Sequence, residues 1–313
     1  MKLQFDYTDF INEEFPAKKE ELPSHKKLVE HFDRITALLF DSANQLLKQK
    51  KHSGNDLNAQ FENIRHTLIA NYRLRSINLM KTLEEVKNVD GEGLIDEGTV
   101  NIIARSLLES YLVFFNLYKQ SSQDLETQKL YFSLYELSSI LQFKKYTAAV
   151  LKKNSRQNPA NLDLDKKTSV LIDQVINNTS YDTLSKKVKD SIVRVKDKKQ
   201  DFLSFINFSK LIKLSPLPTN FATEYYSYAS SFAHSEGFSI NISQMLQGNP
   251  QKWQLFNKLL KFRLMSVCLY ISSQFLISFI EDEQIQSDDD QELDLMQVFS
   301  LADYYIKAMN RND

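Results

Sequence analysis

Apolar residues recur every three or four positions along almost the whole chain, and this spacing constrains the fold more than any other feature. In the stretch from Ser24 to about Lys51, for example, Leu28, Phe32 and Ile35 fall on one face of a helix. Further helices are predicted from after Asp56 to Leu83 and at about 97–119, 123–153, 164–177, 181–200, 201–213, 220–235 and 251–281. No region alternates with a period of two residues between turn dipeptides, so no strand is predicted.

The composition agrees with a helical chain. Only six of the 313 residues are glycine, which works against glycine-rich phosphate loops, β-sandwiches and doubly wound sheets. Hydrophobic residues make up 42% and charged residues 25%, as in a globular protein that can bury a core without disulfides or metals. The sequence therefore predicts an all-α, multi-helix bundle.

Two of the predicted helices, at about 97–119 and 251–281, are apolar on almost every side. A helix of that kind is normally buried, so we expect these two at the centre of the bundle. The stretch Leu264–Ile280 has no charge but contains four serines and Gln274, and its seventeen residues are at the short limit for a membrane span. We therefore expect a core helix and no membrane partner.

Changes in composition predict the organisation of the chain. Residues 1–23 form an N-terminal arm, 24–281 a single helical domain, 282–294 an acidic linker, and 295–313 a C-terminal helix. Eight of the fourteen residues from Glu281 to Asp294 are acidic, which is typical of a solvated linker and less often of a partner-binding tail.

The charge and the cysteine content narrow the possible functions. Lysine and arginine total 39 and aspartate and glutamate 40, so a net charge of −1 gives no general attraction to nucleic acids or membranes. The one cysteine, Cys268, can form no intrachain disulfide and is expected to be a buried, slow-reacting thiol. The first residues lack the apolar core of a signal peptide, so a cytoplasmic location is the default expectation.

Motifs for nucleotide, metal or serine-nucleophile chemistry are missing from the sequence. There is no GxxxxGK[ST], GxGxxG or GxSxG, and no histidine follows a glutamate by three positions as in di-iron bundles. Glu62 and His66 share a helix face, but no second pair completes a metal site. No cofactor and no metal are therefore expected.

A basic stretch from Lys186 to Lys199 has two interpretations. Its seven lysines and arginines would attract phosphates. However, an apolar stripe that includes Leu184, Val188 and Ile192 runs through the same stretch, as in any exposed amphipathic helix. The sequence alone leaves both a phosphate-binding face and a solvated face open.

One polar line interrupts the apolar helix at 97–119. Asn101, Arg105 and Glu109 are spaced four residues apart and therefore lie above one another on one face. A buried charge is costly unless it is paired, so this line should face polar partners or a pocket. It predicts either an internal salt bridge that stabilises the bundle or a ligand site.

A second polar line lies on the helix predicted at about 220–235. Ser227, Ser230 or Ser231, and His234 share one face, with the histidine near the helix C-terminus, where its protonated form is favoured. A histidine that simply bonds a serine or a carbonyl in the core is the alternative interpretation. If the two lines belong to one site, Arg105, Glu109 and His234 must converge.

These residues resemble a known group of proteins. The segment Ala104–Tyr111 (ARSLLESY), followed by Tyr226, Ala229 and Ser230 on the way to His234, resembles an uncharacterised group of bacterial all-helical proteins. Its members have an Arg-x-x-x-Glu helix and later a tyrosine-rich helix ending in Ser-x-x-His. They are grouped with the HEPN-like (higher eukaryote and prokaryote nucleotide-binding) helical folds.

The resemblance covers roughly residues 95–240 and implies an architecture more than an activity. It adds Tyr226 to the candidate ligand-binding residues. Ribonucleases of the HEPN type have an arginine and a histidine on one helix with four to six residues between them, and no arginine here has a histidine at that spacing. An RNA-cleaving reaction would therefore require Arg105 and His234 to meet from separate helices.

Three functions remain open from the sequence. The first is a helical protein that binds a small or nucleotide-like ligand at Arg105, Glu109 and His234. The second is a HEPN-like enzyme that cleaves RNA, with His234 as acid or base and Arg105 holding phosphate. The third is a structural or interaction protein without a pocket, for example a homo-oligomer.

Overall fold

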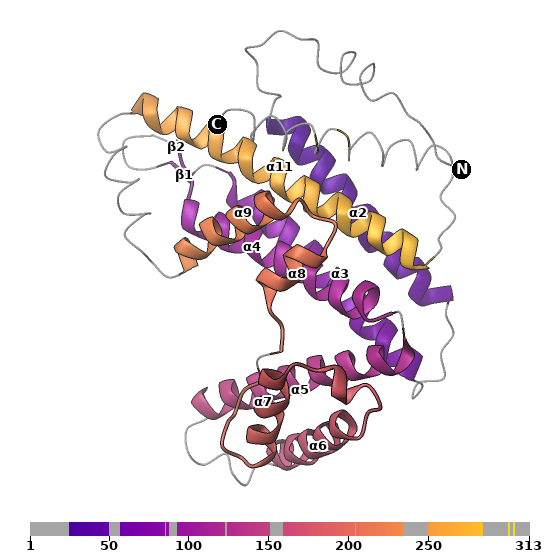
Figure 1. Ribbon diagram of the computed structural model, residues 1–313. Coiled ribbons are helices and arrows are strands. Elements are labelled where there is room, and N and C mark those ends of the chain that lie inside the picture. Colours follow the sequence, from indigo (N-terminus) through magenta and orange to yellow (C-terminus); the bar gives the residue numbers. More distant parts are fainter. Residues whose placement is uncertain are drawn as a thin grey trace. The chain divides into compact units, whose positions relative to one another are not determined.

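The computed structural model describes residues 25–49, 57–84, 86–87, 93–122, 124–150, 159–203, 205–233, 250–283, 300 and 303 (Figure 1). Its helices are α2 (His25–Gln49), α3 (Leu57–Thr82), α4 (Glu97–Phe114), α5 (Leu125–Val150), α6 (Pro159–Ile176), α7 (Lys186–Lys196), α8 (Phe208–Leu214), α9 (Thr219–Ala233) and α11 (Pro250–Glu283). A π-helical segment, η1 (Phe115–Gln120), continues α4, and a 3₁₀ turn, η3 (Tyr181–Thr183), precedes α7. The prediction of an all-α, multi-helix fold is confirmed.

Two helix starts differ from the sequence prediction. The helix predicted to begin at about 164 begins five residues earlier, at Pro159, as α6. Proline is well suited to the first position of a helix because its N–H would have no partner there. The piece expected at 201–213 is helical only from Phe208, where the Asn207 side chain caps α8 by accepting a hydrogen bond from the backbone N–H of Lys210 (3.0 Å).

The prediction of no strands is corrected at one place. β1 (Val86–Lys87) pairs antiparallel with β2 (Gly93–Leu94), so that Val86 lies opposite Leu94 and Lys87 opposite Gly93. With two residues in each strand, the pair is too short to produce a period-two pattern in the sequence.

The described residues form two compact units, one within 1–112 and 212–313 and the other within 113–211. The single domain predicted at 24–281 stays a prediction. The arm at 1–23 and nearly all of the acidic linker and C-terminal helix predicted at 282–313 lie outside the described residues.

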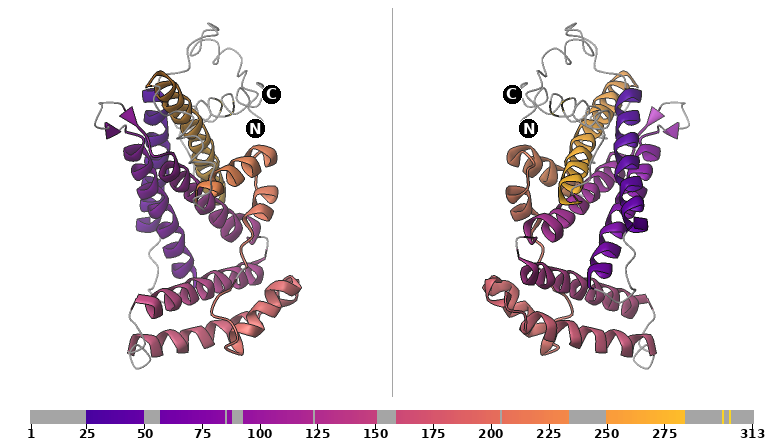
Figure 2. Two further views of the ribbon diagram at one scale, coloured as in Figure 1. Left: turned by 90° about the vertical axis from the view of Figure 1, so that its left-hand side faces the viewer. Right: turned by 90° about the vertical axis from the view of Figure 1, so that its right-hand side faces the viewer.

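The first unit is built around α11. This helix lies along α2, and α2 lies along α3 (Figures 1 and 2). In the C-terminal half of α11, the Phe275 ring is 4.9 Å from the Tyr72 ring of α3 and 5.7 Å from the Tyr111 ring of α4, measured between centroids. The Tyr72 hydroxyl shares a 2.7 Å hydrogen bond with Ser272. The predicted central position of the two apolar helices is confirmed for α4 and α11.

The buried serines of α11 have hydrogen-bond partners inside the protein. Ser272 and Ser273 each donate to a carbonyl one turn earlier, at 2.7 and 2.9 Å. Two stretches, Glu97–Gln120 and Trp253–Glu283, are long and apolar enough to cross a membrane, but their most apolar windows are 67% and 83% buried in the protein. Mostly buried core helices pass the same test of length and composition, so the expectation of no membrane partner stays a prediction. Cys268 is buried as expected, and burial raises the pKa of its thiol.

A buried charge cluster connects α3 to the end of α11. The Arg65 guanidinium lies 3.3 Å from an Asp282 carboxylate oxygen and 3.7 Å from one of Glu62, and it also contacts Glu283. Arg65 thus pairs with three carboxylates that are buried or partly buried, and its opposite charge offsets part of the cost of burying them. The cluster therefore fixes the last turn of α11 against α3.

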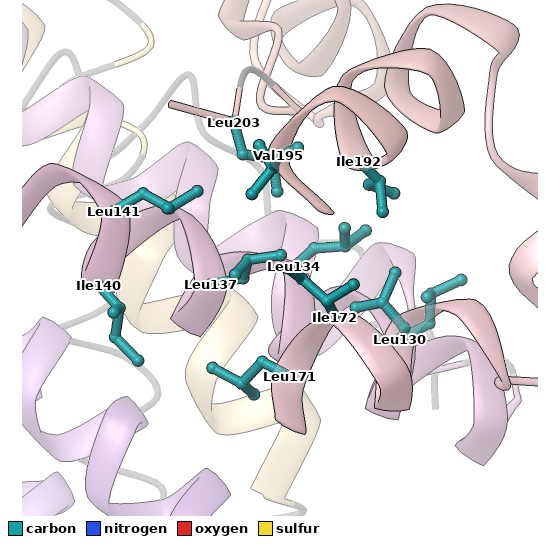
Figure 3. Close-up of a cluster of buried hydrophobic side chains, with 11 residues drawn as sticks. Leu130, Leu134, Leu137, Ile140, Leu141, Leu171, Ile172, Ile192, Val195 and Leu203 are labelled. Atoms are coloured by element: carbon teal, nitrogen blue, oxygen red, sulfur yellow. The ribbon is translucent and has the colours of Figure 1, made fainter. Parts of the chain in front are cut away.

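The second unit is a small bundle of α5, α6 and α7. Figure 3 shows leucines of α5, such as Leu134 and Leu137, directed toward Ile172 of α6 and Ile192 and Val195 of α7. Leu184 and Val188 pack against the same cluster, so the apolar stripe predicted at 184–195 does face a core.

Candidate functional site

The polar line predicted on α4 is present and is one residue longer than the sequence suggested. Glu97, Asn101, Arg105 and Glu109 follow one another at four-residue spacing. Asn101 is fully buried, and its amide nitrogen donates to the Glu97 carbonyl at 2.9 Å. Within the described residues, its Oδ1 has no hydrogen-bond partner. Asn101 therefore belongs to the line without being hydrogen-bonded to Arg105.

Arg105, Glu109 and Tyr226 form a closed triangle of hydrogen bonds, which we name the Arg105 triangle. The Arg105 Nε donates to Glu109 Oε1 at 2.9 Å, and its Nη2 donates to the Tyr226 hydroxyl at 3.1 Å. The Tyr226 hydroxyl in turn donates to the same Glu109 oxygen at 3.2 Å. Each group therefore has a partner that complements its donor or acceptor character.

The Tyr226 ring also packs against the face of the Arg105 guanidinium. The Arg105 Cζ lies 4.8 Å from the ring centroid, which is within cation–π range. Because Nε and Nη2 are both hydrogen-bonded and the Tyr226 ring packs against it, the guanidinium is held in one orientation. Its Nη1 has no hydrogen-bond or ion-pair partner among the described residues, and the side chain is 23% exposed.

The charges in the triangle reinforce one another. Partial burial acts to lower the pKa of Arg105, but Glu109 and Tyr226 outweigh it and raise that pKa. Burial, and then the Glu109 charge, raise the pKa of Tyr226, so the phenol stays protonated and continues to donate to Glu109 near neutral pH. At physiological pH the triangle thus consists of a cation, an anion and a neutral hydroxyl.

The serines predicted for the site are used elsewhere. The Ser230 hydroxyl donates to the Tyr226 carbonyl at 2.5 Å, and the Ser231 hydroxyl donates to the Tyr228 carbonyl at 2.7 Å. Both bonds stay within α9, as is common for serines in helices. Neither serine is hydrogen-bonded to Arg105 or Glu109 in the described part of the chain.

His234 lies outside the described residues, so its convergence with Arg105 and Glu109 stays a prediction. Of the predicted set, the structure brings together Arg105, Glu109 and Tyr226. These three residues come from two helices, α4 and α9, whose contact could not be read from either sequence segment alone.

A second cluster on α4 was missed by the sequence analysis. The Tyr228 hydroxyl donates to a carboxylate oxygen of Glu97, and the Arg263 Cζ of α11 lies 4.3 Å from the Tyr228 ring centroid. Burial raises the pKa of Glu97, against the smaller opposing effects of Tyr228 and Arg263. Glu97 could have been found by extending the polar line one turn toward the N-terminus.

No group of three or more potential metal ligands occurs among the described histidines, cysteines, aspartates and glutamates. The pair noted in the sequence has other partners: the His66 Nε2 shares a 2.7 Å hydrogen bond with the Asn44 side-chain oxygen, and Glu62 pairs with Arg65. The expectation that the chain binds no metal and no cofactor stays a prediction.

No protein-family model matches the chain, and neither a curated protein nor a solved structure gives a significant match. The HEPN-like resemblance therefore stays a hypothesis. The chemistry of the Arg105 triangle is the basis on which a function can be proposed.

Proposed function

We propose that the chain is a helical binding protein whose Arg105 triangle holds one anionic group, a carboxylate or a phosphate, of a small or nucleotide-like ligand. The supporting observation is the unpartnered Nη1 of a guanidinium that is already fixed in orientation. A planar guanidinium with free N–H groups is the side chain best matched to these two anions.

Fixing the arginine in advance favours binding. Ordering a long side chain costs about 0.5–1.5 kcal/mol when it happens on binding. In the triangle, Glu109 and Tyr226 have already ordered Arg105 before any ligand arrives. Glu109 also offsets the arginine charge, so the site favours a ligand with one anionic group over a polyanion.

A rival function is a purely structural salt bridge between α4 and α9. The two differ in what Arg105 does beyond the triangle. A structural role needs only the bonds to Glu109 and Tyr226, whereas a binding role uses Nη1 as well. An arginine that is about one quarter exposed is accessible enough for that second role.

The test is ligand retention by the purified full-length chain. Small molecules and RNA that co-purify with wild type, Arg105→Gln and Arg263→Gln are identified by mass spectrometry. Arg263→Gln is the matched control, because it removes the same charge from above another tyrosine of α9. We expect an anionic species with wild type and Arg263→Gln that is lost from Arg105→Gln.

Two outcomes contradict the proposal. One is the same set of bound species in all three proteins. The other is an Arg105→Gln chain that no longer folds, as judged by circular dichroism, since the triangle would then be internal scaffolding.

A further inference from the structure

The two compact units have opposite charge. Residues 113–211 contain 17 lysines and arginines but only 10 aspartates and glutamates, a net charge of +7. The rest of the chain has 22 basic and 30 acidic residues, a net charge of −8. The overall charge of −1 conceals this difference, so the nucleic-acid attraction that the whole chain lacks is present in one of its units.

The positive charge of this unit is concentrated on the solvent side of α7. The apolar side of α7 is used by the core, where Ile192 and Val195 are buried. We define the α7 basic surface as the exposed cations of residues 186–199, on α7 and just after it, that have no carboxylate within ion-pair distance among the described residues: Lys186, Lys187, Arg194, Lys196 and Lys198. Lys189 and Lys199, in contrast, are paired with Asp182 and Asp197.

Exposed aromatic rings occur in the same unit. Phe143, Tyr146 and Phe202 are 54%, 69% and 48% exposed, and they are the exposed aromatic residues of the described chain. Lys145 lies between the first two on α5 and is also exposed. No aromatic residue occurs among the lysines of 186–199 in the sequence, because these rings belong to other segments of the unit.

The segment that contains Phe202 is hydrogen-bonded to α5, the helix that contains Phe143 and Tyr146. Ser138 of α5 donates a 3.2 Å hydrogen bond to the Leu203 carbonyl. Figure 3 shows Leu203 near Val195 of α7 and Leu141 of α5, so the C-terminal end of α7 and the later turns of α5 share one side of the core. Cations and exposed rings therefore gather on a single small bundle.

We propose that the unit within 113–211 binds single-stranded nucleic acid, with phosphates on the α7 basic surface and bases stacked on Phe143, Tyr146 and Phe202. A positively charged surface combined with exposed rings is the usual arrangement for binding single strands. α7 spans about 15 Å at 1.5 Å per residue, enough to contact several successive phosphates. This surface is separate from the Arg105 triangle and does not depend on the function proposed for it.

A membrane is a poorer match for this surface. A helix that lies on a membrane inserts its apolar side between the lipids. In α7 that side is already buried against α5 and α6, so only its charged side is available.

The test is fluorescence anisotropy of the full-length chain with a labelled single-stranded oligonucleotide of about 20 nucleotides and mixed sequence. The variant Lys187→Gln, Arg194→Gln, Lys196→Gln removes three exposed, unpaired charges without touching the core. The matched control is Lys48→Gln, Lys81→Gln, Lys258→Gln, which removes three exposed charges from the other unit.

We expect the α7 variant to bind at least about tenfold more weakly than wild type and the control to stay within about twofold. The slope of log K against log salt should decrease in magnitude by about 2 in the α7 variant, at roughly 0.7 per lost phosphate contact. The double variant Phe143→Ala, Tyr146→Ala should weaken binding and leave the slope unchanged.

Three results would overturn the proposal. The first is no binding of the wild-type chain at about 50 mM salt. The second is an equal loss of affinity in the α7 variant and the control. The third is binding to vesicles that contain phosphatidylserine, or to polyglutamate, with none to the oligonucleotide.

Discussion

The two clusters on α4 use the same residue types in different ways. In each one, a glutamate of α4 accepts a hydrogen bond from a tyrosine of α9, and an arginine lies over the tyrosine ring. In the Arg105 triangle, the arginine is hydrogen-bonded to both partners, and Arg105 and Glu109 are each about one quarter exposed. In the second cluster, Glu97 is buried, and Arg263 stacks on the Tyr228 ring with no hydrogen bond to either partner among the described residues.

This difference indicates different roles. The Glu97 carboxylate is buried at its partly buried contact with Tyr228, so losing the tyrosine hydroxyl leaves a charge with little access to solvent. Glu109 and Tyr226 hold an arginine at the surface, where water can replace a lost bond. The first arrangement is suited to stability and the second to recognition.

The largest effect expected from this comparison is on stability. Tyr228→Phe should lower the free energy of unfolding by about 1–3 kcal/mol, because the Glu97 carboxylate loses its donor while it stays buried. Tyr226→Phe makes the same chemical change two residues earlier but should cost only about 0.5 kcal/mol, since Glu109 keeps its bond to Arg105 and its access to water. Urea denaturation of both variants measures the two values. Equal losses would remove the distinction between the clusters.

A smaller effect should appear in the pH dependence of stability. Burial raises the pKa of Glu97 above its ordinary value of 4.5, so the folded chain holds this proton more tightly than the unfolded chain. The Glu97 contribution therefore makes the free energy of unfolding fall as the pH rises from about 4.5 through the folded-state pKa.

Glu97→Gln should remove that fall, since the amide oxygen still accepts from Tyr228 and no longer titrates. Urea denaturation at several pH values between about 4 and 7 compares the variant with wild type. The free energy of unfolding of Glu97→Gln minus that of wild type should increase as the pH rises. A difference that is constant, or that shifts the other way, contradicts the burial of a titrating Glu97.

Local sequence patterns predicted the helices and two of the three residues of the Arg105 triangle. The four-residue spacing of Arg105 and Glu109 was sufficient to predict their salt bridge, because both residues are on one helix. Glu97 was missed because it stands at the start of α4, where an acidic residue is expected for reasons of helix polarity alone. The roles of Tyr228 and Arg263 depend on which helices pack together, and no local pattern contains that information.

The central claim concerns the Arg105 guanidinium. It is fixed in one orientation by hydrogen bonds, and its Nη1 has no partner among the described residues, whereas no such bonds fix Arg263. The most direct measurement is nitrogen–proton NMR of the arginine Nε–H groups during a titration with inorganic phosphate. The variants Arg105→Lys and Arg263→Lys assign the two signals.

The bond to Glu109 should protect the Arg105 Nε–H from exchange and keep its signal sharp. We predict that the Arg105 signal shifts to saturation and that of Arg263 does not. An Arg105 signal that stays in place, or parallel shifts of both signals, would contradict the account.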